Sequence, residues 1–272
     1  MAPMIAPVVS QEWLVSHPDV VVADVRAYLD GRSGADAYRA GHIPGAVFVS
    51  LDVVLADPPS KERGRHPLPN PARFASGLAA CGIGDDTTVV AYDDAGGAMA
   101  ARLVWLLRIL GHDAALLDGG IQAWRGALKT ESPMPASTQF TPRPWPAEAL
   151  ADIDEAATGV FVIDARAAER YRGETEPLDP RAGHIPGARN FPYLGNLTDD
   201  LRFRSREELR GRFADIADAG SVISTCGSGI TACHNLIALE YAGLGRGRLF
   251  PGSWSQYSAT ERPAAVGDEQ GS

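Results

Sequence analysis

The chain of 272 residues carries the same heptapeptide twice. Ala-Gly-His-Ile-Pro-Gly-Ala occupies residues 40–46 and returns, letter for letter, at residues 182–188. Each copy follows a β-branched run that closes on Asp-x-Arg, first at residues 24–26 and then at residues 164–166. The offsets between these pairs are 142 and 140 residues. Several elements that recur in one order at nearly one spacing predict a duplicated domain.

Predicted strands and helices alternate within each half, over about 130 residues. Strands are expected at residues 20–26, 87–92, 114–117, 160–166 and from 221 onward, with helices at residues 98–110 and 230–241. Such alternation predicts an α/β fold in which each half is a mostly parallel sheet flanked by helices.

Proline-rich stretches mark the expected loops and boundaries. Residues 131–148 hold five prolines and little periodicity, as expected of a linker between domains. The expected domains are therefore residues 1–141, with the linker starting at about 131, and residues 142–272. Residues 57–71 also hold five prolines and are expected to be an irregular loop. The tail, residues 264–272, lacks large apolar side chains and is expected to be disordered.

One cysteine stands where a strand is expected to turn into a helix. Cys226 is followed by Gly227, Ser228 and Gly229, which are small enough for the backbone to curl round the sulfur. Backbone amides would then point at the sulfur, at the positive end of the helix dipole. Both features favour a thiolate, so Cys226 is the candidate nucleophile.

Charge and cysteine usage restrict the classes of partner. A formal net charge of −9 argues against a surface for nucleic acid or an anionic membrane. Cys81 and Cys233 are expected to fill space, and Cys233 should lie too far along its helix for a disulfide with Cys226. An odd number of cysteines without paired spacing fits a reducing, cytoplasmic compartment. No signal peptide, membrane span, metal or organic cofactor is expected.

The first half is expected to lack the nucleophile. Sliding the cysteine loop back by 132 residues places Cys226 on Asp94, with Gly243 on Gly111 and Gly252 on Gly120. A carboxylate cannot act as a sulfur nucleophile, so only the second half should carry the chemistry. His42 and His184 lie in identical turns and are expected to hold those turns.

The two Gly-His-Ile-Pro-Gly-Ala turns, the two Asp-x-Arg strand ends and the single Cys-Gly-Ser-Gly-Ile-Thr loop resemble the two-domain rhodanese-type sulfurtransferases. The resemblance covers residues 8–258 and implies tandem rhodanese-like domains. It also implies a relay in which Cys226 takes a sulfane sulfur from a small anionic donor, becomes a persulfide and passes the sulfur to a thiol or cyanide. A thioredoxin-like protein is a candidate acceptor.

The residues after Cys226 resemble those of the 3-mercaptopyruvate branch, in which glycine and serine follow the cysteine. Thiosulfate would then be the weaker donor, and a rhodanese that prefers thiosulfate is the alternative. The turn would steady the anionic outer sulfur with hydrogen-bond donors from four residues: Gly227, Gly229, Ile230 and Thr231.

Ser228, His66 and Asp52 resemble the Ser-His-Asp set that this branch is proposed to use for moving protons while the carbon–sulfur bond breaks. His66 opens His-Pro-Leu-Pro, similar to the family's His-x-Leu-Pro, and Asp52 follows the first heptapeptide by six residues. A histidine of the first half would thus reach a serine of the second. Alternatively, Ser228 could cap the following helix and His66 could be a solvated loop residue.

Two arginines are candidates for holding the donor. Arg170, in Glu-Arg-Tyr, matches the family's arginine in an Arg-aromatic step. The resemblance implies a second arginine before the second heptapeptide, and Arg181 is the nearest candidate. A guanidinium fork suits the carboxylate of mercaptopyruvate or the oxygens of thiosulfate. The alternative for Arg170 is a solvated surface position.

Two other functions share a cysteine loop. A cysteine phosphatase resembles this arrangement but has an arginine six residues after the cysteine and a histidine just before it. Ala232 and Thr225 stand at those positions. A non-enzymatic sulfur carrier or sensing module is the alternative from another class, and it would load one sulfur without turning over.

Overall fold

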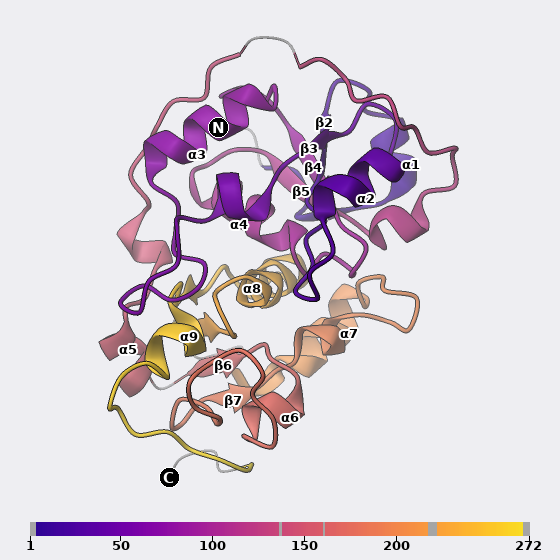
Figure 1. Cartoon of the computed structure of the whole chain (residues 1–272). Coiled ribbons are helices and arrows are strands. Elements are labelled where there is room, and N and C mark those ends of the chain that lie inside the picture. Colours follow the sequence, from indigo (N-terminus) through magenta and orange to yellow (C-terminus); the bar gives the residue numbers. More distant parts are fainter. Residues whose placement is uncertain (1–3, 136–137, 160, 217–221, 269–272) are drawn as a thin grey trace. The chain divides into compact units, whose positions relative to one another are not determined.

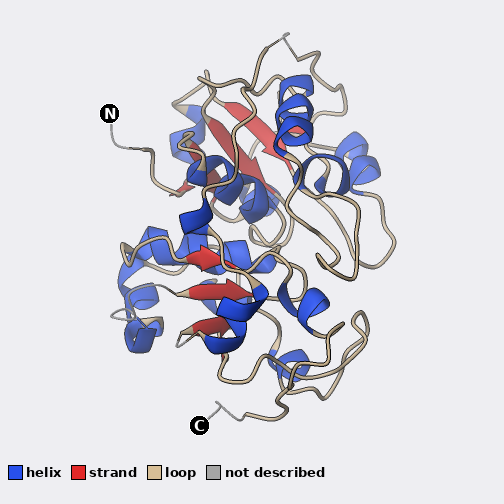
Figure 2. Cartoon of the chain, turned by 90° about the vertical axis from the view of Figure 1, so that its left-hand side faces the viewer, coloured by secondary structure: helices blue, strands red, loops and turns tan. Residues whose placement is uncertain are grey.

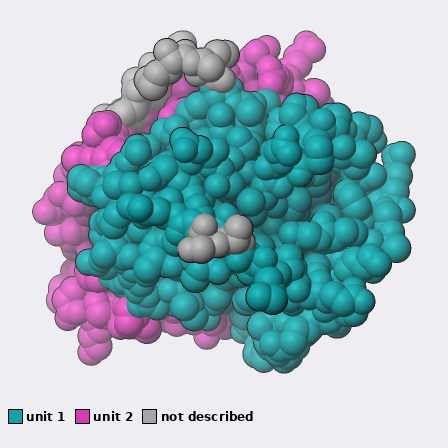
Figure 3. Space-filling model, turned by 90° about the horizontal axis from the view of Figure 1, so that it is seen from above, with its two compact units in different colours: residues 1–57, 69–145, 199–203 teal, residues 58–68, 146–198, 204–272 magenta. Residues whose placement is uncertain are grey.

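The computed structural model describes residues 4–135, 138–159, 161–216 and 222–268. The chain forms two compact units, coloured separately in Figure 3. Unit 1 comprises residues 1–57, 69–145 and 199–203, and unit 2 comprises residues 58–68, 146–198 and 204–272. Eleven residues of the proline-rich loop, 58–68, therefore belong to the unit that is built from the second half.

Unit 1 is built on a five-stranded sheet in the order β1-β5-β4-β2-β3, and its strand pairs are parallel. The strands are β1 (Val8–Val9), β2 (Val21–Asp24), β3 (Val47–Phe48), β4 (Val89–Tyr92) and β5 (Ala114–Leu117). The helical segments are α1 (Gln11–Val15), α2 (Gly34–Ala40), η1 (Leu51–Leu55), α3 (Pro71–Ala80), α4 (Ala100–Ile109) and η2 (Gly120–Ala123). Helices cover the sheet on both faces (Figures 1 and 2). The central strands β2 and β4 are therefore rich in apolar and β-branched residues.

Unit 2 repeats this plan with a four-stranded parallel sheet in the order β7-β6-β8-β9. Its strands are β6 (Val162–Asp164), β7 (Arg189–Asn190), β8 (Ile223–Thr225) and β9 (Arg248–Leu249). The helical segments are η3 (Ala147–Ala149), α5 (Ile153–Thr158), α6 (Ala168–Tyr171), η4 (Tyr193–Asn196), α7 (Arg206–Arg212), η5 (Ala214–Ile216), α8 (Thr231–Ala242) and α9 (Ser253–Tyr257). The predicted fold class is confirmed. Residues 160 and 221, at the starts of two predicted strands, lie outside the described residues.

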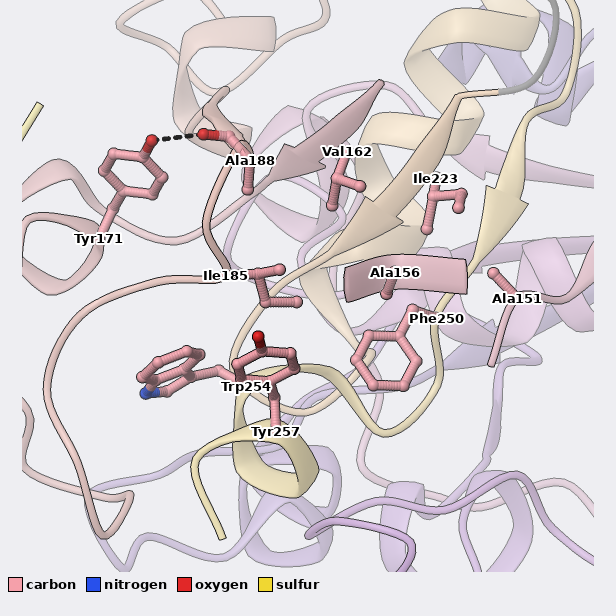
Figure 4. Packing of buried hydrophobic residues seen from close by; sticks show 10 residues of the cluster. All are labelled: Ala151, Ala156, Val162, Tyr171, Ile185, Ala188, Ile223, Phe250, Trp254 and Tyr257. Carbon is pink, nitrogen blue, oxygen red and sulfur yellow. Dashed lines mark hydrogen bonds between the residues drawn. The ribbon is translucent and has the colours of Figure 1, made fainter. Parts of the chain in front are cut away.

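An aromatic cluster packs against the unit 2 strands. Phe250, Trp254 and Tyr257 pack against Ile185 and the apolar side chains of β6 and β8 (Figure 4). The same segment bonds to the strand that leads into the cysteine loop, since the Trp254 amide donates to the carbonyl of Cys226 at 2.9 Å. Burial of these rings therefore also fixes the backbone on which the cysteine is carried.

The two heptapeptide turns are held in the same way. The His42 Nδ1 bonds to the carbonyl of Tyr38 at 2.9 Å, and the His184 Nδ1 bonds to the carbonyl of Tyr171 at 2.8 Å. Each imidazole also stacks on that tyrosine ring, with centroids 4.0 and 3.7 Å apart. Both histidines are fully buried. These contacts agree with the holding role expected from the identical turns.

The C-terminal tail is ordered for part of its length. Ala265 and His184 exchange two backbone hydrogen bonds, of 2.9 and 3.0 Å, and the Gly267 amide donates to the carbonyl of Arg172 at 2.8 Å. The prediction of disorder from residue 264 is therefore wrong for residues 264–267. Composition misled the prediction because backbone pairing to a buried turn needs no large apolar side chain. Residues 269–272 lie outside the described part of the chain.

Strand register corrects the residue that corresponds to Cys226. The aspartates of the two Asp-x-Arg ends pair with Tyr92 of β4 and with Thr225 of β8. The next residues, Asp93 and Cys226, are therefore equivalent, and the prediction of Asp94 is wrong by one position. A constant offset fails because α4 begins seven residues after Asp93, whereas α8 begins five residues after Cys226.

Within the described ranges, no helix is long and apolar enough to cross a membrane.

Candidate active site

Cys226 follows β8 directly, and its sulfur lies inside the turn that leads into α8. The Gly229 amide donates to the Cys226 Sγ at 3.1 Å, and the Cys226 amide donates to the Ser253 Oγ at 3.1 Å. The Cys226 side chain is buried, with 2% of the residue exposed. The turn therefore presents an amide to the sulfur, as expected of a loop that stabilises negative charge there.

The backbone of the turn requires glycine at position 229. Gly229 has φ of +77°, and a Cβ atom on it would lie 2.4 Å from the carbonyl oxygen of Pro251. Any side chain would be strained and would collide with the backbone. This glycine therefore permits the conformation in which its amide reaches the Cys226 sulfur.

Ser228 and His66 are hydrogen-bonded to each other. The Ser228 Oγ lies 2.8 Å from the His66 Nδ1, and the donor depends on the histidine tautomer. Ser228 is 7% exposed. The capping alternative is not what the structure contains, because Ile230 is the N-cap of α8 and no side chain caps it. His66 is likewise bonded to a buried serine rather than only to solvent.

The loop that carries His66 is seated on α9. Gly64 has φ of +83°, and a Cβ atom on it would lie 2.6 Å from the Ser255 Oγ and 2.7 Å from the carbonyl oxygen of Gly252. The Arg65 amide donates to the same Ser255 Oγ at 3.1 Å. The Gln256 side chain donates to the carbonyl of Glu62 at 2.7 Å. These contacts make residues 58–68 part of unit 2 and bring His66 to Ser228.

Asp52 lies in unit 1, in the π-helical turn η1. It is exposed, and its carbonyl accepts a hydrogen bond of 3.1 Å from Arg73. Its service as the carboxylate partner of His66 stays a prediction.

Two guanidinium groups lie beside the residue that follows the cysteine. A Cβ atom on Gly227 would be 3.1 Å from the Arg65 Nη2 and 3.4 Å from the Arg170 Nη1. Burial lowers the pKa of Arg65, and the Arg170 charge lowers it further, while Cys226 and Glu176 oppose both effects. The site thus combines a sulfur with a concentration of positive charge, which suits an anionic ligand.

Acidic side chains form ion pairs with these arginines. Glu176 contacts Arg170 at 2.6 Å and Arg166 at 3.4 Å, and Asp179 forms ion pairs with both Arg65 and Arg170. Burial opposes the charged form of Arg166, but the neighbouring Asp164 outweighs it and raises the pKa. The side chains of Glu176 and Asp179 are almost completely buried.

Arg181, the second predicted donor arginine, is hydrogen-bonded to backbone carbonyls of the C-terminal segment. Its Nε, Nη1 and Nη2 donate to the backbone carbonyls of Ser258, Arg262 and Tyr257, at 2.9, 3.0 and 3.3 Å. All three guanidinium nitrogens thus bond to the C-terminal segment of unit 2. The service of Arg181 as a donor-binding arginine stays a prediction.

The remaining predicted contacts belong to the start of α8. Ile230 is its N-cap and is buried, and Thr231, its first residue, is partly exposed. Cys233 donates from its thiol to the carbonyl of Gly229 at 3.4 Å. Cys81, Cys226 and Cys233 are all free thiols. The described residues hold no group of three or more His, Cys, Asp and Glu side chains that could bind a metal ion.

Comparison with known proteins identifies the architecture. The family model of the rhodanese-like domain matches residues 10–127 and again residues 146–260. The chain belongs to the rhodanese-like domain family. The predicted family is thereby confirmed, with one match in each half of the chain.

Relatives of this rhodanese-like protein span nearly its whole length. A Pseudomonas aeruginosa protein named "Probable 3-mercaptopyruvate sulfurtransferase" is 44% identical over 274 residues, covering 93% of this chain and 95% of the relative. The thiosulfate sulfurtransferase of Cricetulus griseus is 33% identical over 280 residues, covering 92% and 91%. The structure of 3-mercaptopyruvate sulfurtransferase from Leishmania major matches with a TM-score of 0.84 and 33% identity, covering 94% of this chain and 75% of that one.

Sequence reasoning missed two charged residues of this rhodanese-like site, Arg65 and Asp179. Arg65 immediately precedes His66. Because His66 is predicted to contact Ser228, Arg65 could also have been predicted to lie near the cysteine turn. Asp179 lies in the acidic stretch between Arg170 and the second heptapeptide, which composition alone marks as a solvated loop. Only the fold buries it against two arginines.

Proposed function

We propose that this protein is a sulfurtransferase that moves a sulfane sulfur from 3-mercaptopyruvate, through a persulfide on Cys226, to a thiol or cyanide. The observation that carries the proposal is the hydrogen bond of 2.8 Å between His66 and Ser228. Ser228 lies two residues after Cys226 in the sequence. Relatives named for 3-mercaptopyruvate and for thiosulfate support the transferase activity and leave the preferred donor to be decided.

Sulfur uptake begins with attack of the Cys226 thiolate on the thiol sulfur of mercaptopyruvate. A sulfur–sulfur bond forms and the carbon–sulfur bond breaks, with its electron pair passing to the carbon of the leaving group. That carbon must gain a proton to become pyruvate, and the donor thiol must lose one. A hydroxyl bonded to an imidazole can relay this proton, and we assign the relay to Ser228 and His66. Asp52 would orient His66.

The persulfide is then an anion held in the turn after Cys226. The Gly229 amide, which donates to the sulfur in the free chain, can stabilise the charge, and the other predicted donors of the turn would add to it. An acceptor thiolate attacks the outer sulfur and releases the Cys226 thiolate. A small thiol, cyanide or a thioredoxin-like protein can act as acceptor, and we place the reaction in the cytoplasm because the three cysteines are free thiols.

Substitution of Ser228 by alanine tests the donor assignment. The carbon leaving group of mercaptopyruvate needs a proton, whereas the sulfite released from thiosulfate does not. We therefore expect Ser228→Ala to lower kcat/KM for mercaptopyruvate by about 10²- to 10⁴-fold, the usual range for a lost acid–base group. The value for thiosulfate should change by less than about threefold. Steady-state kinetics with both donors and cyanide as acceptor provide the measurement.

The control is Ser76→Ala, which removes an exposed hydroxyl whose hydrogen bond lies within its own helix. Equal losses with both donors would contradict the relay, and a wild-type preference for thiosulfate would contradict the branch. Intact mass measured after donor and then acceptor separates an enzyme from a carrier, because a carrier loads one sulfur and stops.

A further inference from the structure

Arg65 and Arg170 converge on the peptide that follows Cys226. Their guanidinium nitrogens would lie 3.1 and 3.4 Å from a Cβ atom on Gly227. Two cations that approach one point repel each other unless an anion lies between them. The pair therefore forms a place for a carboxylate with two oxygens, next to the sulfur.

In the free chain the same two guanidinium groups already share a carboxylate of the protein itself. One carboxylate oxygen of Asp179 bonds to the Arg65 Nη1, and the other lies 3.4 Å from the Arg170 Nη2. The Asp179 side chain is 2% exposed. It thus presents to the two arginines the same planar, singly charged group that mercaptopyruvate would bring.

Glu176 and Asp179 differ in how they are attached. Glu176 accepts the backbone amides of Leu178 and Asp179 at 3.1 and 3.2 Å, and it also bonds Arg170. Its carboxylate therefore stabilises the turn through two backbone amides. The Asp179 carboxylate is engaged with the two arginines, so its departure would leave the turn supported by Glu176.

Arg170 has bonding capacity to spare. Its Nε is buried and lacks a hydrogen-bond partner, although the same guanidinium is paired with two carboxylates. An unpartnered donor on a buried cation favours the arrival of a further oxygen. Arg181, by contrast, has its guanidinium nitrogens bonded to carbonyls, which leaves Arg65 as the better second arginine.

We propose that Arg65 and Arg170 together bind the carboxylate of the sulfur donor, and that Asp179 occupies this position in the free chain and is displaced when the donor binds. This inference rests on the proposed function for the identity of the donor. Asp179 then acts as an internal competitor that weakens the binding of anions and disfavours ligands too weakly charged to displace it.

Calorimetric titration with pyruvate tests the proposal without any sulfur chemistry. Pyruvate carries the donor's carboxylate and keto groups, so its binding can be measured even if mercaptopyruvate proves not to be the donor. We expect Asp179→Asn to lower the Kd of pyruvate by about tenfold and Arg65→Gln to raise it by about tenfold, the effect of one charge-assisted hydrogen bond. The Kd of pyruvamide, which is neutral, should be the same in both variants as in the wild-type protein.

Matched controls come from an exposed ion pair on the same segment, Arg172 with Glu174. Glu174→Gln and Arg172→Gln should leave the Kd within about twofold of wild type. Weaker or unchanged pyruvate binding in Asp179→Asn would overturn the proposal, since it would make Asp179 a residue that merely positions the arginines. If the wild-type protein did not turn over mercaptopyruvate but the pyruvate results were as expected, only the proposed function would be overturned.

Hydrogen exchange on the unmodified chain tests the displacement even if Asp179→Asn fails to fold. Saturating pyruvate should accelerate amide exchange in residues 176–181 by about tenfold, because the segment loses its ties to two arginines. Slower or unchanged exchange there would contradict the displacement of Asp179.

Discussion

The loops that follow β4 and β8 stand at the same place in their sheets but hold different groups. In unit 1 the Asp93 carboxylate accepts four backbone amides, from Ala95, Gly97, Met99 and Ala100, at 2.7 to 2.9 Å. In unit 2 the equivalent residue is Cys226, and its sulfur accepts the Gly229 amide. Each strand-to-helix turn therefore points backbone amide hydrogens at its first side chain, from four groups in unit 1 and from the Gly229 amide in unit 2, which is the property of an anion site.

The two turns differ in the chemistry of the side chain that the amides meet. Unit 1 supplies its own carboxylate, which is fully buried and cannot leave. Unit 2 places a cysteine there, and in the proposed function its sulfur takes up a second sulfur atom and releases it. One copy thus uses the turn as a structural element, and we propose that the other uses it to hold a reaction intermediate.

The largest expected effect is that of Cys226→Ser, which would make both copies unreactive. We expect sulfur transfer to fall by about 10³-fold or more, as for the loss of a covalent nucleophile. The mass of the protein after incubation with donor should then show no added sulfur. Cys81→Ser, in the other unit, serves as the control and should retain activity. Sulfur transfer that persists in Cys226→Ser would contradict the proposal that only the loop after β8 carries the nucleophile.

Asp93→Asn should lower stability where Cys226→Ser does not. The amide side chain would turn an NH₂ group toward two of the four backbone donors that the carboxylate now accepts. We expect a loss of about 2–4 kcal/mol in the free energy of unfolding for Asp93→Asn and less than about 1 kcal/mol for Cys226→Ser. Urea unfolding monitored by circular dichroism gives both values. A comparable loss in the two variants would show that Asp93 and Cys226 contribute equally to the stability of their loops.

The smallest effect concerns acid, and it belongs to unit 1. Burial lowers the pKa of His112 below its ordinary value of 6.5, and its Nδ1 donates to the carbonyl of Asp85 at 3.0 Å. Below the ordinary pKa the unfolded chain binds a proton that the folded chain resists, so stability falls as the pH drops through and below 6.5. Above it the effect vanishes.

Thermal unfolding followed from about pH 7.5 to about pH 5.5 should therefore show a smaller decline in His112→Gln than in wild type, since the glutamine does not titrate in this range. Equal slopes for the two proteins would remove His112 from the acid response.

Much of the fold was predictable because its signals are local. The strand predicted at residues 114–117 coincides with β5, and the predicted helices at 98–110 and 230–241 differ from α4 and α8 by one or two residues at their ends. The repeated heptapeptide predicted two copies of one domain, since a turn that needs histidine, proline and glycine together rarely recurs by chance. Cys226, Gly227 and Ser228 drew attention for the same reason, as small residues at a strand-to-helix turn.

What the sequence by itself determined is thus what neighbouring residues decide: the elements, their duplication and the cysteine turn. The tertiary structure decided which residues distant in sequence meet. It placed residues 58–68 in unit 2, matched Asp93 rather than Asp94 to Cys226, turned Arg181 toward backbone carbonyls and buried Asp179 between Arg65 and Arg170. These outcomes depend on strand register and on desolvated ion pairs across more than a hundred residues, and no local pattern of side chains encodes either.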